Sequence, residues 1–309
     1  MAKDGWVTGS ARAAGGSRDY KLWVPLGLAR EKPVPLLMLL HGCTHGAEDM
    51  AEISGMNEVA NRNQFLVVYP EQSRLANLLK CWNWFDPKHQ SRDAGEPAIL
   101  AEIVRQVSSK NAVDPERVFV VGISAGGAMA VIAAAAYPDL FSALGVAAGA
   151  EFQAAQGVPD GLVVMKQGGP DPVKQGKAAF AAMRPGLARK PRKRLPVIVF
   201  HGTEDASVNC VNADQIVAQW SETNACLAAE AEEKGFSISE ERTAETVPGG
   251  HSFDRYVYAD QTGRLLMEKW IVKGLGHAWS GTPKAHRYCD PKGPNASEEI
   301  WRFFCQAAS

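Results

Sequence analysis

The fold of this chain is decided by the stretch Val118-Phe119-Val120-Val121-Gly122-Ile123-Ser124-Ala125-Gly126. Its first four residues are apolar, as in a strand buried on both faces, and the apolar run from Gly126 to Ala136 predicts a helix. A strand, a G-x-S-x-G turn and a helix in this order indicate a nucleophile elbow, a strained turn that lifts the serine hydroxyl above the sheet. Larger side chains at positions 122 and 126 would collide with the neighbouring strand and helix, which explains both glycines.

Similar apolar runs recur along the chain, and helix-like segments separate them. This alternation predicts a mostly parallel central sheet flanked by helices, and together with the elbow it indicates the α/β-hydrolase fold. The expected buried strands are Leu36–Leu40, Phe65–Val68, Val118–Val121, Ala143–Ala148 and Val197–Phe200. The expected helices are Met50–Asn61, Pro97–Ser108, Gly126–Ala136 and Ala213–Glu222.

Outside these runs, the periodicity of the sequence changes. Alternation over Tyr20–Val24 predicts an antiparallel edge strand. Farther on, Arg255–Tyr258 and Leu265–Val272 predict a hairpin that leads into the final strand. Asn295 and Glu298 have the spacing of a capping box, so a last helix is expected to begin there.

Length and composition limit the class of protein. With 309 residues, of which 46% are hydrophobic, the chain has enough apolar material for one large core. We therefore expect a single catalytic domain over residues 1–309, with an irregular insertion at 153–196 and no separate substrate-binding domain. The 33 basic and 34 acidic residues nearly cancel, so neither nucleic acid nor a membrane is expected as a partner.

The cysteines and the chain start bear on the compartment. Six cysteines suit three disulfides, and no apolar signal core follows Met1. A secreted protein written without its signal peptide fits both observations, so an extracellular or periplasmic location is expected. A cytoplasmic enzyme with buried thiols is the alternative.

An elbow serine needs a base to take its proton and a carboxylate to hold that base. In this fold the order along the chain is serine, acid, histidine. Asp205 follows the expected strand Val197–Phe200, and His277 follows the last expected strand, so both are expected at the carboxyl edge of the sheet beside Ser124. Glu204 is the alternative acid and His251 the alternative base.

The remaining histidines are expected to have other roles. His41 and His201 each precede a glycine at a strand end, where an imidazole often anchors loop backbone. His45, His89 and His286 show no ligand spacing with cysteines or carboxylates, so no metal and no cofactor is expected.

The tetrahedral intermediate needs two hydrogen-bond donors for its oxyanion. The fold supplies the amide that follows the nucleophile and one from the loop after an early strand. In this chain these are the amides of Ala125 and of Cys43, which follows the expected strand Leu36–Leu40.

Further motifs accompany these residues, and together they resemble the polyhydroxybutyrate depolymerase and feruloyl esterase family of α/β-hydrolases. The resemblance runs from about residue 17 to 304 and implies the same triad. It implies hydrolysis of an ester in short-chain polyhydroxyalkanoate polymer or oligomers or, as the alternative, of feruloyl or acetyl esters on plant polysaccharide such as xylan. The motifs are His41-Gly42-Cys43, Tyr69-Pro70-Glu71-Gln72, Cys81-Trp82-Asn83-Trp84-Phe85, Gly95-Glu96-Pro97, Gly122 to Gly127, His201-Gly202-Thr203 and Gly276-His277-Ala278-Trp279.

The resemblance also implies a disulfide between Cys43 and Cys81, which ties the oxyanion loop to the loop around Trp82. Trp82 and Trp279 are expected to contact substrate, because indole rings give a large contact area at a small entropic cost. Trp84 is the weaker candidate, since it is more naturally placed facing inward.

The other four cysteines are further disulfide candidates. Cys210 and Cys289 lie just beyond the loops with the expected acid and base, and a bridge between them would brace the two loops. Cys226 and Cys305 remain, and nothing in the sequence decides their pairing because six cysteines allow fifteen connectivities. Six reduced thiols are the alternative.

The expected reaction is acyl transfer in two steps. His277 deprotonates Ser124, which attacks the ester carbonyl, and water activated by His277 then releases the acid from the acyl-enzyme. Asp205 orients the imidazole. An acyltransferase, in which an alcohol or sugar replaces water, is the alternative from another enzyme class.

Overall fold

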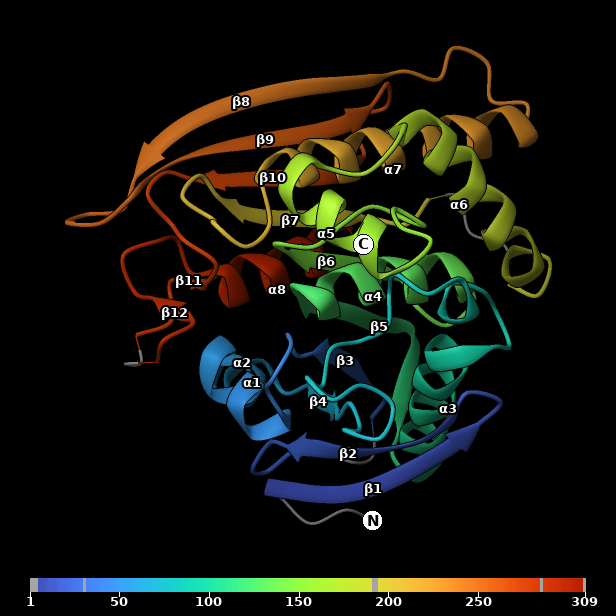
Figure 1. Ribbon diagram of the computed structural model, residues 1–309, viewed down its shortest axis with the longest axis vertical. Helices are drawn as coiled ribbons and strands as arrows, with labels where there is room; N and C mark the ends of the chain where they lie inside the picture. Colours follow the sequence, from blue (N-terminus) through green and yellow to red (C-terminus); the bar gives the residue numbers. More distant parts are fainter. Residues whose placement is uncertain (1–4, 30–31, 191–193, 284–285, 308–309) are drawn as a thin grey trace.

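A ten-stranded sheet forms the centre of the computed structural model, which describes residues 5–29, 32–190, 194–283 and 286–307 (Figure 1). The central strands are parallel, and antiparallel strands lie at both edges. In spatial order the strands are β1 (Gly5–Ala13), β2 (Gly16–Val24), β4 (Leu66–Pro70), β3 (Val34–Leu40), β5 (Val113–Ile123), β6 (Ala143–Ala147), β7 (Val197–Gly202), β10 (Leu265–Val272), β9 (Ser252–Asp260) and β8 (Ile238–Thr246).

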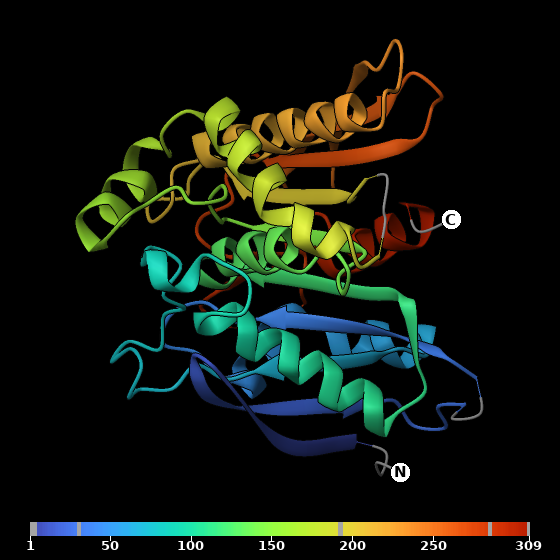
Figure 2. The ribbon, with the colours of Figure 1, turned by 90° about the vertical axis from the view of Figure 1, so that its right-hand side faces the viewer.

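Helices cover both faces of the sheet, which buries its central strands completely. One face is packed by α3 (Gly95–Lys110), α4 (Ala125–Ala136) and α7 (Val211–Glu230), with α6 (Pro172–Leu187) lying on α4 and α7. The other face is packed by α1 (Ala47–Ser54), α2 (Met56–Asn63) and α8 (Ala296–Ala307). Figure 2 shows these layers, with α4 in front of the sheet and α8 behind it. The expected α/β-hydrolase architecture is confirmed.

Most expected elements are present, with shifted ends. The hairpin β9–β10 and the last helix are as expected, and Asn295 caps that helix by accepting a hydrogen bond from Glu298 N at 3.1 Å. The predicted helix Met50–Asn61 is wrong in one respect. It is broken at Gly55, whose φ of 63° ends α1 and begins α2.

The irregular insertion expected at 153–196 is wrong for the described part of that segment, which contains the helices α5 (Val158–Gln167) and α6. Glycines within both helices hide them, because glycine is a poor helix former. Gly176 is required by packing, since a side-chain carbon there would lie 2.6 Å from Gln219 O on α7.

The strand register brings four loops to one edge of the sheet. Leu40 of β3 pairs with Gly122 of β5, so the loops after these two strands are neighbours. Gly202 of β7 pairs with Val272 of β10, which places the next two loops side by side. The helix α5 also lies at this edge (Figure 2). Within the described ranges, no helix has the length and apolar character needed to cross a bilayer.

Candidate active site

Ser124 occupies the turn between β5 and α4. Its backbone has φ 57° and ψ −126°, a conformation that costs about 1–3 kcal/mol for a residue other than glycine and is concentrated at functional sites. A side-chain carbon at Gly122 would lie 2.1 Å from Gly126 O, and one at Gly126 would lie 2.4 Å from Leu40 O. The two glycines therefore allow β3, β5 and α4 to approach closely enough to form the elbow.

Asp205 and His277 meet in the adjacent loops after β7 and β10. His277 Nδ1 donates a hydrogen bond to Asp205 Oδ2 at 2.7 Å, and the carboxylate is completely buried. The other oxygen, Oδ1, accepts hydrogen bonds from the amides of Ser207 and Val208 at 2.9 and 2.8 Å. Burial alone raises the pKa of Asp205, but the hydrogen bonds from His201 and His277 outweigh it and hold the pKa well below its usual range. The carboxylate is therefore ionised and fixed, and it leaves Nε2 of His277 available as the base.

The rival residues take other positions. Glu204 is exposed, and His251 bonds Asp290 at 2.9 Å. Within the described residues, no hydrogen bond joins Ser124 to His277, although both lie at the same edge of the sheet. Bonds of this kind often form only when substrate is bound.

The two expected oxyanion donors are both unengaged. The amides of Cys43 and Ala125 donate to no other described residue. The loop that presents Cys43 is held by His41, whose Nε2 accepts a hydrogen bond from Gln72 N at 3.0 Å and whose Nδ1 therefore donates to Gly42 O at 2.7 Å. Burial lowers the pKa of His41 to about 4, so this imidazole is a neutral structural anchor, as expected.

Cys43 and Cys81 form a disulfide, which confirms the first implied pairing. The bridge joins the oxyanion loop to the 71–94 loop, and Thr44 N donates to Leu79 O at 2.6 Å beside it. Both cysteines also line the cavity described below. The disulfide therefore fixes the loop that bears the Cys43 amide and a wall of the cavity together.

The second expected bridge, between Cys210 and Cys289, is wrong. Cys210 precedes α7 on one face of the sheet, whereas Cys289 lies in β12 (Cys289–Asp290) and donates to a carbonyl of α1 on the other face at 3.2 Å. Burial raises the pKa of the Cys210 thiol to about 11. Cys226 on α7 and Cys305 on α8 likewise lie on opposite faces of the sheet, so no bridge joins the two.

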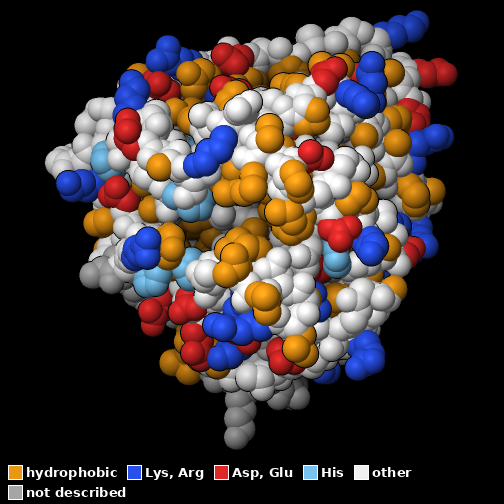
Figure 3. All heavy atoms as spheres, in the orientation of Figure 1, with side chains coloured by type: hydrophobic (Ala, Val, Ile, Leu, Met, Phe, Trp, Pro, Cys, Tyr) orange, Lys and Arg blue, Asp and Glu red, His pale blue; other side chains and the backbone are white. Residues whose placement is uncertain are grey.

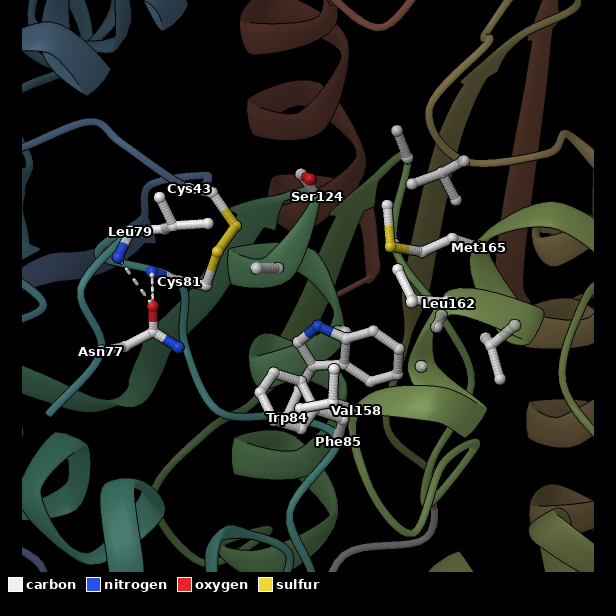
Figure 4. Close-up of a pocket in the computed structure, with 18 residues that line it drawn as sticks. Cys43, Asn77, Leu79, Cys81, Trp84, Phe85, Ser124, Val158, Leu162 and Met165 are labelled. Atoms are coloured by element: carbon white, nitrogen blue, oxygen red, sulfur yellow. Dashed lines mark hydrogen bonds between the residues drawn. A yellow bond between two sulfur atoms is a disulfide. The ribbon is translucent and has the colours of Figure 1, made fainter.

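An apolar cavity of about 440 Å³ opens at Ser124 (Figure 4). The disulfide forms one side, the rings of Trp84 and Phe85 form the floor, and α5 forms the opposite side. Figure 3 shows apolar side chains gathered over the same face, with histidines beside them. The lining residues are Cys43, Asn77, Leu79, Cys81, Trp84, Phe85, Ser124, Ala125, Ala128, Ala148, Gly149, Ala150, Val158, Gly161, Leu162, Val164, Met165 and Val208.

The substrate contacts expected for Trp82 and Trp279 are wrong. Both side chains are completely buried and neither lines the cavity. Trp82 packs near the ring of His41, and Trp279 in β11 (Trp279–Ser280) donates to Ser297 Oγ at 3.1 Å. Trp84, the weaker candidate, is the tryptophan at the cavity.

A buried polar cluster that the sequence did not reveal holds the cavity wall. The carboxylate of Glu96 is completely buried and pairs with Arg18 at 3.0 Å. It also accepts hydrogen bonds from the backbone and the side chain of Asn83, both at 2.8 Å, and from Gln72. Arg18 Nε donates to Gln72 Oε1 at 2.6 Å. Because Gln72 N also bonds His41, this cluster connects the cavity wall to the oxyanion loop.

The described residues contain no group of three or more His, Cys, Asp or Glu side chains arranged to hold a metal ion. The groups that the described site does present are the hydroxyl of Ser124, the imidazole of His277, the carboxylate of Asp205 and the amides of Cys43 and Ala125.

A family model described as Esterase PHB depolymerase matches residues 18–243. This chain belongs to that family. Among its curated relatives is poly(3-hydroxyalkanoate) depolymerase C of Paucimonas lemoignei, which is 31% identical over 84% of this chain and 57% of its own length. Feruloyl esterase B of Thermothelomyces thermophilus is 27% identical over 79% of this chain and 78% of its own length.

The chain thus spans little more than half the length of the depolymerase relative. A solved acetyl xylan esterase from Aspergillus awamori has the same fold, with a TM-score of 0.71 over 97% of this chain and all of that chain, at 18% identity. Family membership and fold agree with the architecture described above.

Proposed function

We propose that this chain is a serine esterase that hydrolyses carboxylic esters through an acyl-enzyme. The observation that carries the proposal is the Asp205–His277 hydrogen bond at 2.7 Å, at the same sheet edge as the strained Ser124. Asp205 selects the tautomer in which Nε2 of His277 accepts the serine proton. The amides of Cys43 and Ala125 then stabilise the oxyanion, and His277 returns the proton to the leaving alcohol.

As the main substrate we propose a short-chain polyhydroxyalkanoate, as polymer or oligomers. The lining of the cavity supports this, because its side chains are overwhelmingly apolar and include no Asp, Glu, Lys or Arg among the described residues. A depolymerase relative covers most of this chain. A volume of about 440 Å³ accommodates a short acyl segment.

A feruloyl ester on polysaccharide is the second candidate. The rings of Trp84 and Phe85 at the cavity floor favour it, since aromatic side chains stack well on an aromatic acyl group. A feruloyl esterase is also among the relatives.

One comparison tests the reaction and the substrate class. The purified protein is assayed with hydroxybutyrate oligomers, methyl ferulate and acetylated xylan, beside p-nitrophenyl butyrate as a general ester. Ser124→Ala should fold normally and abolish turnover of every ester, and a fluorophosphonate should label the wild type and leave Ser124→Ala unlabelled. Turnover by Ser124→Ala would refute the mechanism, and a preference for methyl ferulate would replace the first substrate with the second.

We also propose that the described chain works as one catalytic unit outside the cytosol. The sheet is continuous from β1 to β8, which supports one unit. The disulfide between Cys43 and Cys81 supports an extracellular or periplasmic location, because such bonds persist in oxidising compartments.

A further inference from the structure

His45 differs from the other histidines in its hydrogen bonding. The structure describes all seven, and in six of them a ring nitrogen bonds backbone or a carboxylate. Nδ1 of His45 is buried and has no partner among the described residues. Burial of an unsatisfied polar atom is costly, so a group of this kind calls for an explanation.

His45 lies close to the proposed nucleophile, Ser124, with Gly42 between them. A side-chain carbon built on Gly42 would lie 3.5 Å from Ser124 Cβ and 3.6 Å from His45 Nδ1. The inner edge of the ring therefore faces the backbone beside the elbow. Burial lowers the pKa of His45, and the imidazoles of His286 and His277 act in the same direction against Asp49. The ring is therefore neutral at neutral pH.

An aromatic wall supports the outer side of the ring. The centroid of the Tyr288 ring lies 4.6 Å from that of His45 at an interplanar angle of 82°, and the ring of His286 lies 6.1 Å away. Both neighbours are half-buried, and Arg287 between them is exposed. Figure 3 shows histidine side chains together on this face, next to the apolar mouth of the cavity.

The chemistry of the proposed reaction decides which part of an ester faces this wall. His277 must protonate the leaving oxygen, so the alcohol part lies on the His277 side of Ser124. The cavity contains both oxyanion donors, but neither His277 nor His45 is among its described lining residues. Figure 4 shows Ser124 at one end of that cavity. The cavity therefore takes the acyl part, and the alcohol part extends from Ser124 toward His277 and His45.

The tautomer of His45 follows from its burial. Among backbone groups, a buried N–H without an acceptor is rarer than a buried carbonyl without a donor, and we apply the same preference to this imidazole. In the neutral ring the proton therefore belongs on Nε2, which is not among the buried unsatisfied atoms. This leaves a neutral donor on the more open edge of the ring.

We propose that His45 is the leaving-group contact of this site, where its Nε2–H donates a hydrogen bond to a carbonyl or carboxylate oxygen in the alcohol part of the ester. A hydroxyacyl unit supplies such an oxygen a few bonds from the scissile ester, whereas a hydrocarbon alcohol supplies none. The inference rests on the proposed function and deepens it. It assigns to His45 the preference for an ester whose alcohol is itself a hydroxy acid.

Two butyrate esters test this contact. One has methyl (R)-3-hydroxybutanoate as its alcohol and the other has the matching hydrocarbon alcohol, 2-hexanol. Both form the same butyryl-enzyme, so the ratio of their kcat/KM values reports steps up to departure of the alcohol. We expect the wild type to favour the hydroxybutanoate ester and His45→Phe to lower this ratio by about tenfold, equivalent to about 1.4 kcal/mol.

Two further variants separate the hydrogen bond from the fold. His45→Gln places an amide near the position of Nε2 and should retain most of the ratio. His45→Asn is too short to do so and should lower the ratio as His45→Phe does, which keeps the test decisive if the phenylalanine variant does not fold. A ratio within about twofold of the wild type in both His45→Phe and His45→Asn would overturn the inference, and so would an equal loss for both esters.

The proposed function fails in a different way. If it is wrong, the wild type hydrolyses neither ester, or Ser124→Ala hydrolyses both. If only the leaving-group contact is wrong, the wild type hydrolyses both esters and the ratio does not depend on residue 45.

Discussion

Replacing both Cys43 and Cys81 with serine removes a disulfide that spans a sequence separation of 38. For a loop of this size, a cross-link removes about 13 cal/mol/K of conformational entropy from the unfolded chain, which corresponds to about 4 kcal/mol near room temperature. We expect the double variant to lose about this much of its free energy of unfolding. Because folded domains are stable by only about 5–15 kcal/mol, the loss is a large fraction of the total.

The same change should affect turnover. Complete loss of one oxyanion donor lowers kcat by about 10²–10³-fold. This is the largest fall in kcat that displacement of the Cys43 amide could cause. His41 and the bond from Thr44 N to Leu79 O still hold the loop, so we expect a smaller fall, of about tenfold.

Urea unfolding followed by tryptophan fluorescence, together with kcat on p-nitrophenyl butyrate, measures both effects. Wild type treated with dithiothreitol should match the double variant, and Cys226→Ser, which leaves the bridge intact, should match untreated wild type. The reasoning fails if the double variant loses less than about 1 kcal/mol, or if reduced wild type keeps full stability.

Three further outcomes follow from individual side chains. Asp205→Asn should lower kcat on p-nitrophenyl butyrate by about 10⁴-fold with little change in fold, because the amide favours the wrong tautomer of His277; a loss below about tenfold would remove Asp205 from the mechanism. Burial, and to a smaller extent Asp171, raises the pKa of Glu151 from its usual 4.5 to about 8. The folded state therefore binds a proton at this carboxyl more tightly than the unfolded state does. As the pH rises from 4.5 to 8, the carboxyl lowers the free energy of unfolding by an increasing amount. Glu151→Gln should therefore raise the free energy of unfolding by about 3 kcal/mol at pH 7 and leave it nearly unchanged at pH 4, as urea midpoints at the two pH values would show. Leu162, at the cavity, is 60% exposed, and Leu162→Ser should lower kcat/KM for p-nitrophenyl octanoate relative to the acetate by about threefold, whereas an unchanged ratio would place the acyl chain elsewhere.

The parts of the fold that the sequence predicts are those in which local pattern and burial agree. Strands such as β3 and β6 are buried on both faces and consist of short apolar runs, so their composition alone identifies them. The glycines of the elbow are predictable because a specific collision excludes every other residue.

Other elements depend on contacts that no local pattern records. β8 is almost entirely exposed and rich in charge, so it has neither the alternation nor the apolar run of a typical strand, and it exists because β9 pairs with it. The helices α5 and α6 contain glycines that oppose helix formation, and close packing of α6 on α7 compensates at Gly176. In these places tertiary structure overrides propensity.

The residues of the site likewise include some that the sequence predicts and some that it does not. Asp205 and His277 can be named from the sequence because each follows a strand, and strand ends of a parallel sheet meet at one edge. The tryptophans that contact substrate cannot be named from the sequence, because the path of a loop decides whether an indole lines a cavity or fills the core. Trp82 and Trp84 are two residues apart on the same loop, yet only the second reaches the cavity.

The cluster around Glu96 explains why that loop has a defined path. A buried carboxylate and a buried guanidinium are each very costly alone, so Glu96 and Arg18 must stay together once the chain has folded. The backbone amide of Asn83 donates to the same carboxylate, and Asn83 lies between the two tryptophans. The ion pair thereby fixes the backbone between the two indoles, and through Gln72 and His41 it also holds the loop that presents the Cys43 amide, the proposed oxyanion donor. The side chains of five residues thus act as one positioning unit, and their spacing in the sequence carries no trace of it: Arg18, His41, Gln72, Asn83 and Glu96.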